Sequence, residues 1–316
     1  MTVFNEGDIL RQSIASVLQQ SYADLELVIV DDGSESPRTR EILDSLDDPR
    51  VKLLRQENDG LSSARNRGLR HCGGDYICFL DSDDVRAPWA FADVTSAIEE
   101  TGSDLVLVSG VHASPTTRLK PFFDENVTLG AQQEAEETGA LSSKAIRAWA
   151  AAYEPQSANK YIARDLIERG RLAFPNDHFF EDILFHSMVI AHARSVHLLS
   201  SRNFTYFSRQ LRRQLTSSNE QIRFDIIGVA KVTFELFAQH PDFQNPRQRG
   251  AVSIGILRLL RWCEGSLPLY HRRAFRLSLA EALRQIDPLF LLIHPETPDP
   301  RRERVTLSRY ANSMQG

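Results

Sequence analysis

Cysteine is scarce in this chain of 316 residues, which contains only Cys72, Cys78 and Cys263. These three form neither a CxxC pair nor a Cys/His spacing suited to zinc, and so sparse a count fits a reducing cytoplasm better than a disulfide framework. The sequence also lacks a run of about 18 uncharged apolar residues and an N-terminal leader pattern. We therefore expect a soluble cytoplasmic protein or one bound peripherally at the inner face of a membrane.

Glycine-rich phosphate motifs are missing as well: no GxGxxG follows a strand pattern and no GxxxxGK[ST] occurs. The net charge of −5 offers no general attraction to nucleic acid, so we expect no nucleic-acid partner. Arginine clusters such as LRRQL, HRRAFR and RRER gather in the last third. They favour an anionic partner or a membrane surface, although a solvated helix face is the commoner cause of such clusters.

Strand and helix patterns alternate over the first 110 residues. The β-rich runs LELVIV, VKLLRQ, DYICFL and DLVLVSG are separated by helical patterns such as ILRQSIASVLQQ and WAFADVTSAIEE. This alternation predicts βαβ units and a parallel sheet that is buried on both faces. The opening TVFNEG is typical of the end of a strand, so the first strand is expected to be either short or truncated.

The rest of the chain has more helical patterning. Residues 111–140 are polar, and helices are expected at about 141–152, at 157–169 and from 181. Beyond residue 220 the spacing of apolar residues is helical throughout.

Polar residues follow three of the predicted strands. These are Asn5 and Glu6, then Asp31 and Asp32, and then the cluster DSDD at 81–84. Because the carboxyl ends of parallel strands line the ligand crevice of an open sheet, we expect the three groups to meet. Any one of them alone is also explained by a turn or a helix cap.

The DSDD cluster is the most informative of the three. Alternate residues of an extended chain point the same way about 6.6 Å apart, so Asp81 and Asp83 can face one crevice. A pair of carboxylates suits Mg²⁺ or Mn²⁺ held together with a substrate diphosphate. Arg65, expected in the first turn of its helix, offers a cation for the same anion.

Four successive segments, TVFNEG, SIASVLQQSYADLELVIVDDGS, NDGLSSARNRGL and GDYICFLDSDD, resemble the signatures of family-2 glycosyltransferases over residues 2–110. The resemblance implies a GT-A fold: an α/β, Rossmann-like and mostly parallel sheet flanked by helices, with a mainly helical C-terminal region. ANKYIARDLIERGRLAFPNDHFFEDILF and YFSRQLRRQLTSS are similar to the acceptor half of bacterial members. No QxxRW-like segment occurs, so the non-processive type is the better guide.

The resemblance also implies roles for individual residues. A nucleotide-sugar would be bordered by Thr2, Phe4, Glu6, Asp31, Asp32, Arg65, Asp81 and Ser82. Asp83, with Asp81, would ligate Mn²⁺ or Mg²⁺. Asp182 would be the general base of an inverting transfer, with Glu181 positioning it. Contacts with the acceptor or the diphosphate are assigned to His178, Lys160, Arg209 and His112.

The implied donor is UDP-linked, and the implied acceptor is a glycan or a lipid-linked precursor of a cell-envelope polysaccharide. Residues 1–110 would form the nucleotide-sugar half, 111–219 the acceptor half with the Glu-Asp pair, and 220–316 a helical extension of unknown role. The sequence leaves open which sugar is transferred.

Two other functions remain to be weighed. DSDDV also fits the DxDx[TV] pattern of haloacid-dehalogenase-like phosphohydrolases, whose first Asp is a nucleophile. However, that motif normally opens its domain, whereas two βα units precede it here. The second alternative is a non-catalytic module that binds a nucleotide or a protein partner.

Overall fold

The computed structural model describes residues 1–114, 117–122, 124–176, 178–208, 221–299 and 306–312. The chain forms two compact units that interleave along the sequence. The first comprises residues 1–125, 157–177 and 194–210, and the second 126–156, 178–193 and 211–316. The units therefore cross the functional boundaries expected at residues 110 and 219, and that functional division stays a prediction.

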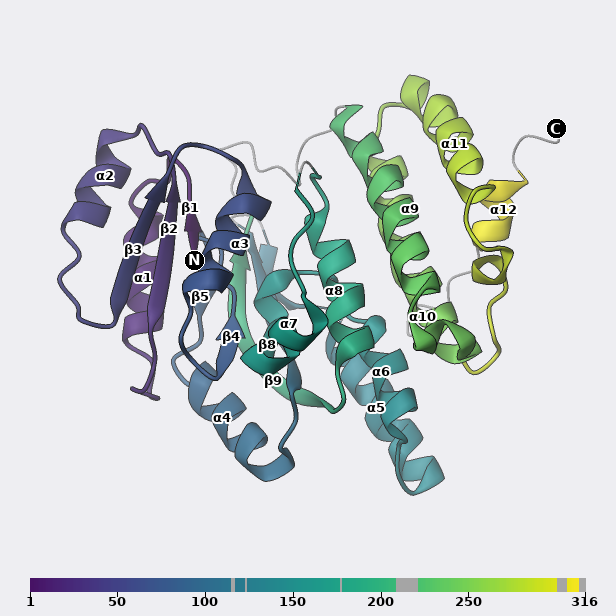
Figure 1. Ribbon diagram of the computed structural model, residues 1–316, viewed down its shortest axis with the longest axis horizontal. Coiled ribbons are helices and arrows are strands. Elements are labelled where there is room, and N and C mark those ends of the chain that lie inside the picture. Colours follow the sequence, from purple (N-terminus) through teal and green to yellow (C-terminus); the bar gives the residue numbers. More distant parts are fainter. Residues whose placement is uncertain (115–116, 123, 177, 209–220, 300–305, 313–316) are drawn as a thin grey trace. The chain divides into compact units, whose positions relative to one another are not determined.

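A parallel sheet with the strand order β1-β2-β3 begins the first unit (Figure 1). Its strands are β1 (Thr2–Val3), β2 (Leu27–Asp32) and β3 (Val51–Gln56). All six residues of β2 are buried, which explains why its first four residues, LVIV, form a continuous apolar run rather than an alternating pattern. Helices α1 (Ile9–Leu18), α2 (Pro37–Asp44) and α3 (Leu61–His71) follow the three strands in turn.

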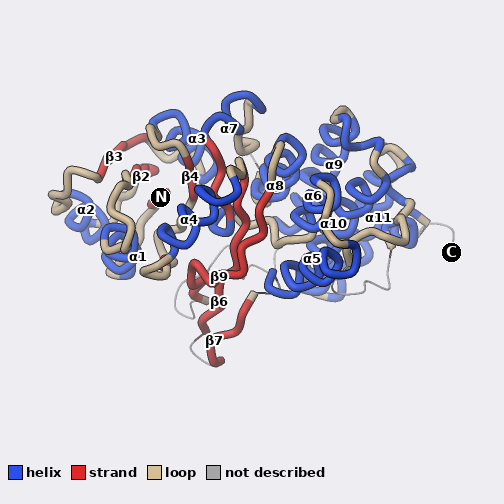
Figure 2. Tube along the Cα trace, turned by 90° about the horizontal axis from the view of Figure 1, so that it is seen from below, coloured by secondary structure: helices blue, strands red, loops and turns tan. Residues whose placement is uncertain are grey.

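A second sheet in the same unit is mixed. Its order is β4-β8-β6-β9-β5, with β7 paired to β6. The bounds are β4 (Tyr76–Cys78), β5 (Val85–Arg86), β6 (Leu105–Ser114), β7 (Thr117–Pro121), β8 (Lys160–Ala163) and β9 (Val196–Phe207). The long strands β6 and β9 run parallel, side by side (Figure 2), whereas β8 is antiparallel to both β4 and β6. A parallel bridge between Thr2, the first residue of β1, and Asp81 joins this strand to the turn after β4.

The mixed sheet corrects two sequence expectations. The parallel pairing predicted from the first 110 residues holds for β1-β2-β3, whereas β4 and β6 are separated by β8, which runs antiparallel to both. The helix expected at 157–169 is instead a short 3-10 turn at Ser157–Asn159, strand β8, and helix α7 at Arg164–Gly170. Tyr161 and Ile162 are strand formers with ready partners on both sides, and tertiary pairing overrides a weak helical spacing.

The second unit is helical over its described residues. Its α-helices are α5 (Asp124–Thr138, its first two residues in the first unit), α6 (Ser143–Ala151), α8 (Glu181–His192), α9 (Asp225–Ala238), α10 (Pro246–Ser266), α11 (Leu269–Leu283) and α12 (Leu307–Ala311). The 3-10 turns are Gln221–Phe224, Pro241–Gln244 and Pro288–Leu291. The helices expected near 141–152 and from 181 are thus confirmed.

Aromatic packing dominates the core of the second unit. Phe290 is fully buried, and its ring centroid lies 4.5 Å from that of Phe234 and 5.1 Å from that of Phe243. Helices α9, α10 and α11 enclose this cluster. In the described part of the chain, we find no helix with the length and apolar content needed to cross a membrane.

Candidate functional site

The loops after β1 and β2 are locked together by Asn5. This residue has a φ of 52°, in the left-handed region that Asn tolerates better than most residues. Its Oδ1 accepts hydrogen bonds from the backbone N–H groups of Glu35 (2.7 Å) and Ser36 (2.8 Å). Its own N–H donates to Ser34 Oγ at 2.9 Å. The NEG and VDDGS segments therefore meet, as the strand-end pattern predicts.

Asp31 and Asp32 hold neighbouring loops in place. Both are buried, and Asp31 Oδ1 accepts the Ser34 N–H at 3.0 Å. The Asp32 carboxylate accepts the N–H groups of Asp59 (2.9 Å) and Gly60 (3.0 Å), which lie in the loop that leads into α3. These bonds give both aspartates a loop-positioning role. Their predicted contact with a nucleotide stays a prediction.

Gly33 allows this close approach of loops. Its φ is +74°, and a Cβ at this position would lie 2.7 Å from the backbone nitrogen of Asn58. Any other residue would push the loop after β2 away from the loop after β3. The glycine of VDDGS is thus required by the backbone geometry at this position.

The DSDD turn alternates between inward and outward side chains. Ser82 is buried: its Oγ donates to Glu6 Oε2 at 3.3 Å, and its carbonyl accepts from Ser13 Oγ at 2.9 Å. Asp84 is also buried, and its Oδ1 accepts the Phe207 N–H at 3.0 Å. Burial raises the pKa of Asp84 well above its usual value, and the nearby negative charge of Asp81 adds to that rise.

Asp81 and Asp83 occupy the alternate, partly exposed positions of the turn. The Asp81 side chain is 40% exposed, and its Oδ1 lies 3.0 Å from Arg65 Nη2. Two carboxylates at a partly open turn are the donor set that a divalent cation shared with a diphosphate requires. In the described residues, no group of three or more acidic, His or Cys side chains is placed to hold a metal by itself. The set therefore fits a cation that a ligand helps to bind.

Arg65 is more enclosed than the sequence predicts. It lies in the second turn of α3 rather than the first, and only 3% of its side chain is exposed. Its guanidinium lies 5.1 Å from the centroid of the Phe174 ring and pairs with Asp81. It thus balances the charge of the acidic turn, and its predicted contact with the base or diphosphate is untested.

Thr2, Phe4 and Glu6 line the start of the same region. Thr2 pairs with Val30 of β2 and with Asp81, and Glu6 is buried against Ser82. Phe4 is 44% exposed, which suits a residue that would pack on a nucleotide base. The structure therefore brings together all eight residues predicted to border the nucleotide-sugar, within one unit.

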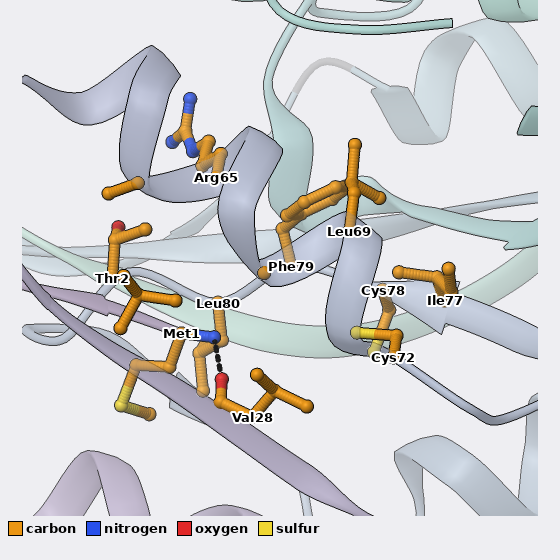
Figure 3. A pocket seen from close by; sticks show the side chains of 13 residues that line it. Met1, Thr2, Val28, Arg65, Leu69, Cys72, Ile77, Cys78, Phe79 and Leu80 are labelled. Carbon is orange, nitrogen blue, oxygen red and sulfur yellow. Dashed lines mark hydrogen bonds between the residues drawn. The ribbon is translucent and has the colours of Figure 1, made fainter. Parts of the chain in front are cut away.

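A small cavity lies beneath this region, between α3 and the strands β2 and β4 (Figure 3). Thr2 and Arg65 line one side, and Cys72, Ile77 and Cys78 line the other. Its volume of about 30 Å³ admits a water molecule or two but no nucleotide. It is therefore distinct from the predicted donor site.

Lys160 and His112 lie elsewhere in the first unit. Lys160 is buried on β8, and its Nζ donates to Asn159 Oδ1 at 2.7 Å, while Asn159 Nδ2 donates to Asp124 Oδ2 at 3.2 Å. His112 lies on β6, with its Nε2 2.6 Å from Ser208 Oγ and its ring beside Tyr206. Their predicted contacts with the acceptor or the diphosphate are untested, and Arg209 lies outside the described residues.

Glu181 and Asp182 form the first turn of α8, in the second unit. Glu181 is buried and Asp182 is partly exposed, so Asp182 is the better placed of the two to meet a substrate. The preceding loop is held by Asp225, whose carboxylate accepts the Phe179 N–H at 2.6 Å and lies 3.1 Å from His178 Nδ1. Asp225 is the first residue of α9, so the start of this helix helps to position the Glu-Asp pair.

Several supporting residues have no signature in the sequence. Asn66 exchanges two hydrogen bonds with the backbone of Phe174, at 2.8 and 2.9 Å, across 108 positions of sequence. The ring of Phe174 in turn packs edge-on against Phe79 at 5.2 Å. The strand alternation points to none of these contacts. The paired amide pattern of Asn66 becomes visible only in three dimensions.

The known proteins that resemble this chain in sequence are described as glycosyltransferases. Residues 1–145 match the family model described as glycosyl transferase family 2. An uncharacterised glycosyltransferase of Bacillus subtilis, EpsJ, is 29% identical over 65% of this chain and 58% of its own. The Escherichia coli protein WfgD, described as a UDP-Glc:alpha-D-GlcNAc-diphosphoundecaprenol beta-1,3-glucosyltransferase, is 43% identical over 27% of this chain and 34% of its own. The chain thus spans about a third to three fifths of the length of these relatives.

The solved structures support the fold. TarS of Staphylococcus aureus, residues 1–349 in complex with UDP-GlcNAc, superposes with a TM-score of 0.73 at 16% identity, covering 92% of this chain and 81% of that one. At this identity the likeness establishes the architecture. The predicted α/β architecture, a mostly parallel sheet flanked by helices with a mainly helical C-terminal region, is thereby confirmed.

Proposed function

We propose that this chain transfers a sugar from a nucleotide-diphospho-sugar to a hydroxyl group of an acceptor, because residues 1–145 match the family model described as glycosyl transferase family 2. The observation that carries the proposal is the meeting of three strand-end segments around a partly exposed pair of aspartates. UDP is the proposed nucleotide, on the strength of the UDP-linked donors named for WfgD and TarS. The proposed acceptor is a glycan or a lipid-linked precursor used in cell-envelope polysaccharide synthesis.

The donor would occupy the region above Asp81 and Asp83. Phe4 offers an exposed ring to the base, and the loops fixed by Asp31 and Asp32 form the adjoining edge. The side chain of Ser82 is committed to Glu6, so Ser82 contributes to this site through the shape of the turn. Prior fixing of these loops reduces the ordering cost of binding.

Mn²⁺ or Mg²⁺ would be held by Asp83 together with Asp81. When bound, the ion would act as a Lewis acid that stabilises the charge of the departing diphosphate. Arg65 already pairs with one carboxylate oxygen of Asp81. Its positive charge would offset part of the negative charge that the two aspartates and the diphosphate bring together. Asp84 keeps the turn anchored to β9 through Phe207.

Asp182 is the proposed general base of an inverting transfer. An acceptor hydroxyl must lose its proton as it attacks the anomeric carbon, and a positioned carboxylate contributes about 10²–10⁴-fold to such a step. The buried Glu181 and the Asp225-anchored loop would fix the orientation of Asp182. Residues His178, Lys160, His112 and Arg209 remain proposed contacts of the acceptor or the diphosphate.

Thermal-shift measurements with UDP-glucose, UDP-GlcNAc, UDP-galactose and GDP-mannose, each with and without Mn²⁺, test the donor assignment. A ligand that binds only the folded state at 100 times its Kd adds about 2.7 kcal/mol to stability. We expect a Mn²⁺-dependent rise of a few degrees in Tm with one of the UDP-sugars. No rise with any donor would contradict the proposal.

The phosphohydrolase interpretation of DSDDV is not favoured, because the comparisons reported above are with glycosyltransferases. Hydrolysis of p-nitrophenyl phosphate separates the two functions: a phosphohydrolase turns it over, and a glycosyltransferase does not. A non-catalytic module would bind the donor but release no UDP in the presence of any acceptor.

A further inference from the structure

Large apolar side chains are exposed where α10 ends and α11 begins. Leu269 and Tyr270 are 79% and 77% exposed, and Trp262 and Leu277 are each 41% exposed. Tyr270, Arg273 and Leu277 follow one another at helical spacing, so they share one face of α11. Trp262, Leu269, Tyr270, Arg273 and Leu277 together are termed the α10–α11 patch.

The charge of this region is of one sign. Residues 265–280 contain three arginines and no aspartate or glutamate. Arg273 is exposed, and Arg272 donates to the backbone oxygens of Leu267 and Gly265, which carry no formal charge. Glu264, which precedes the segment, is buried and is already bound by Arg276 and by the Tyr310 hydroxyl. Glu281, the next acidic residue along α11, pairs with Arg284. Within the described residues no carboxylate pairs with Arg273, so the patch presents one positive charge.

Ring contacts connect this patch to the loop before the Glu-Asp pair. The Phe180 ring packs edge-on against Trp262, with centroids 6.4 Å apart. The Arg223 guanidinium lies 4.3 Å from the centroid of the Trp262 ring. Phe180 immediately precedes Glu181, the first residue of α8. Trp262 of the patch therefore contacts the residue that leads into the Glu-Asp pair.

We propose that the α10–α11 patch docks this protein on an anionic phospholipid bilayer. Leucine and aromatic side chains would enter the headgroup region while Arg273 pairs with a lipid phosphate, the combination typical of interfacial helices. A second copy of the chain would bring like charges together across the patch, which disfavours it as the partner. A sugar-binding surface would need the aromatic rings but neither the two exposed leucines nor Arg273.

The consequence for catalysis rests on the proposed function: a lipid-linked acceptor would reach the Glu-Asp pair from the bilayer on which the patch sits. Membrane binding itself is independent of transfer. Its failure would leave donor binding and the proposed transferase activity untouched.

Vesicle flotation of the full chain tests the proposal. We expect the chain to float with phosphatidylcholine vesicles that contain phosphatidylglycerol, not with pure phosphatidylcholine, and to be released as salt is raised. Replacing both Leu269 and Tyr270 by Ser should weaken binding about tenfold or more, because the membrane-buried apolar area is lost. Arg273→Glu reverses one charge and should weaken vesicle binding about 25-fold. Removing one arginine is expected to weaken it about fivefold, and reversing the charge doubles that change in binding free energy.

The matched controls lie on the other unit. Leu119→Ser alters a leucine that is 65% exposed on β7, and Arg70→Glu reverses an exposed arginine on α3. Both should float like the parent protein, and circular dichroism should show all variants folded. Three results would overturn the proposal: no flotation with anionic vesicles, equal flotation of the patch variants and the parent, or a dimer in sedimentation that the Leu269/Tyr270 variant abolishes without any vesicle binding.

Discussion

The two units differ in what holds their functional residues. In the first unit, loops at the ends of strands are cross-linked by side chains that bind backbone groups, as Asn5 binds Glu35 and Ser36 and as Asp32 binds Asp59 and Gly60. In the second unit, the Glu-Asp pair stands on a helix supported by buried apolar and aromatic residues. The first unit thus depends on particular polar residues, whereas the second combines an apolar core with polar bonds such as that of the Phe179 N–H to Asp225.

The two kinds of support tolerate substitution differently. Polar residues that bind backbone groups cannot be exchanged without loss, whereas apolar residues of similar volume replace one another at small cost. The family model matches residues 1–145, which include most of the first unit and the start of the second. The solved TarS structure nevertheless superposes over 92% of the chain at 16% identity.

The largest expected effect is that of Asp182→Asn in the second unit. Asparagine keeps the size of the side chain but cannot accept the proton of the acceptor hydroxyl, so transfer should fall about 10²–10⁴-fold while donor affinity is unchanged. Release of UDP and calorimetric donor binding measure the two quantities. Glu281→Gln, an exposed change on α11 of the same unit, is the control. Normal turnover of Asp182→Asn would remove this residue from the mechanism.

Core truncation tests whether the second unit depends on volume. Phe290→Ala removes a fully buried ring that packs on Phe234 and Phe243, and should lower the free energy of unfolding by about 3–5 kcal/mol. Phe290→Leu keeps most of the volume and should cost clearly less. Urea unfolding of both variants gives the comparison. Equal losses would mean that shape matters less here than the contrast between the units requires.

Polar substitution tests the first unit in the same way. Asn5→Ala removes the acceptor of two backbone hydrogen bonds and places Ala at a φ of 52°, so we expect a loss of about 2 kcal/mol and weaker donor binding. Asn5→Asp retains an acceptor oxygen and should lose much less. If Asn5→Ala leaves both stability and donor affinity intact, the loops do not depend on this residue.

The smallest expected effect is a pH dependence in the second unit. The hydrogen bond from Arg247 holds the pKa of Glu134 below its usual value, and a bond from Trp149 Nε1 at 2.8 Å acts in the same direction. A lowered carboxyl pKa gives stability that is present above the ordinary glutamate value and is lost as the pH falls through the lowered one. Glu134→Gln should remove about 1 kcal/mol at pH 7 and nothing at the acid end of this window.

Stability measured by denaturant unfolding from pH 7 to pH 3 checks this prediction. Glu137→Gln, an exposed change on the same helix, should leave the pH profile unchanged. A constant difference between Glu134→Gln and the parent protein at all pH values would show that the ion pair makes no ionic contribution.

The sequence predicted local features better than long-range ones for physical reasons. The strand-end clusters at Asn5, Asp31 and Asp83 are visible because turns and carboxylates have a local pattern, and the structure brings their segments together. Strand β8 was missed because its partners β4 and β6 are distant in sequence. The Asn66–Phe174 contact and the Asp225 support of the Phe179 loop are likewise long-range.

Calorimetric titration of the donor with Mn²⁺ present tests the central claim most directly, namely that the turn at Asp81 and Asp83 binds a cation together with a diphosphate. Asp83→Asn should abolish the Mn²⁺-dependent part of UDP-sugar binding. Asp75 is an exposed aspartate that immediately precedes β4, at the opposite end of this strand from the DSDD turn. Asp75→Asn should leave the Mn²⁺-dependent part of UDP-sugar binding unchanged. Equal Mn²⁺-dependent affinity in both variants would contradict the account.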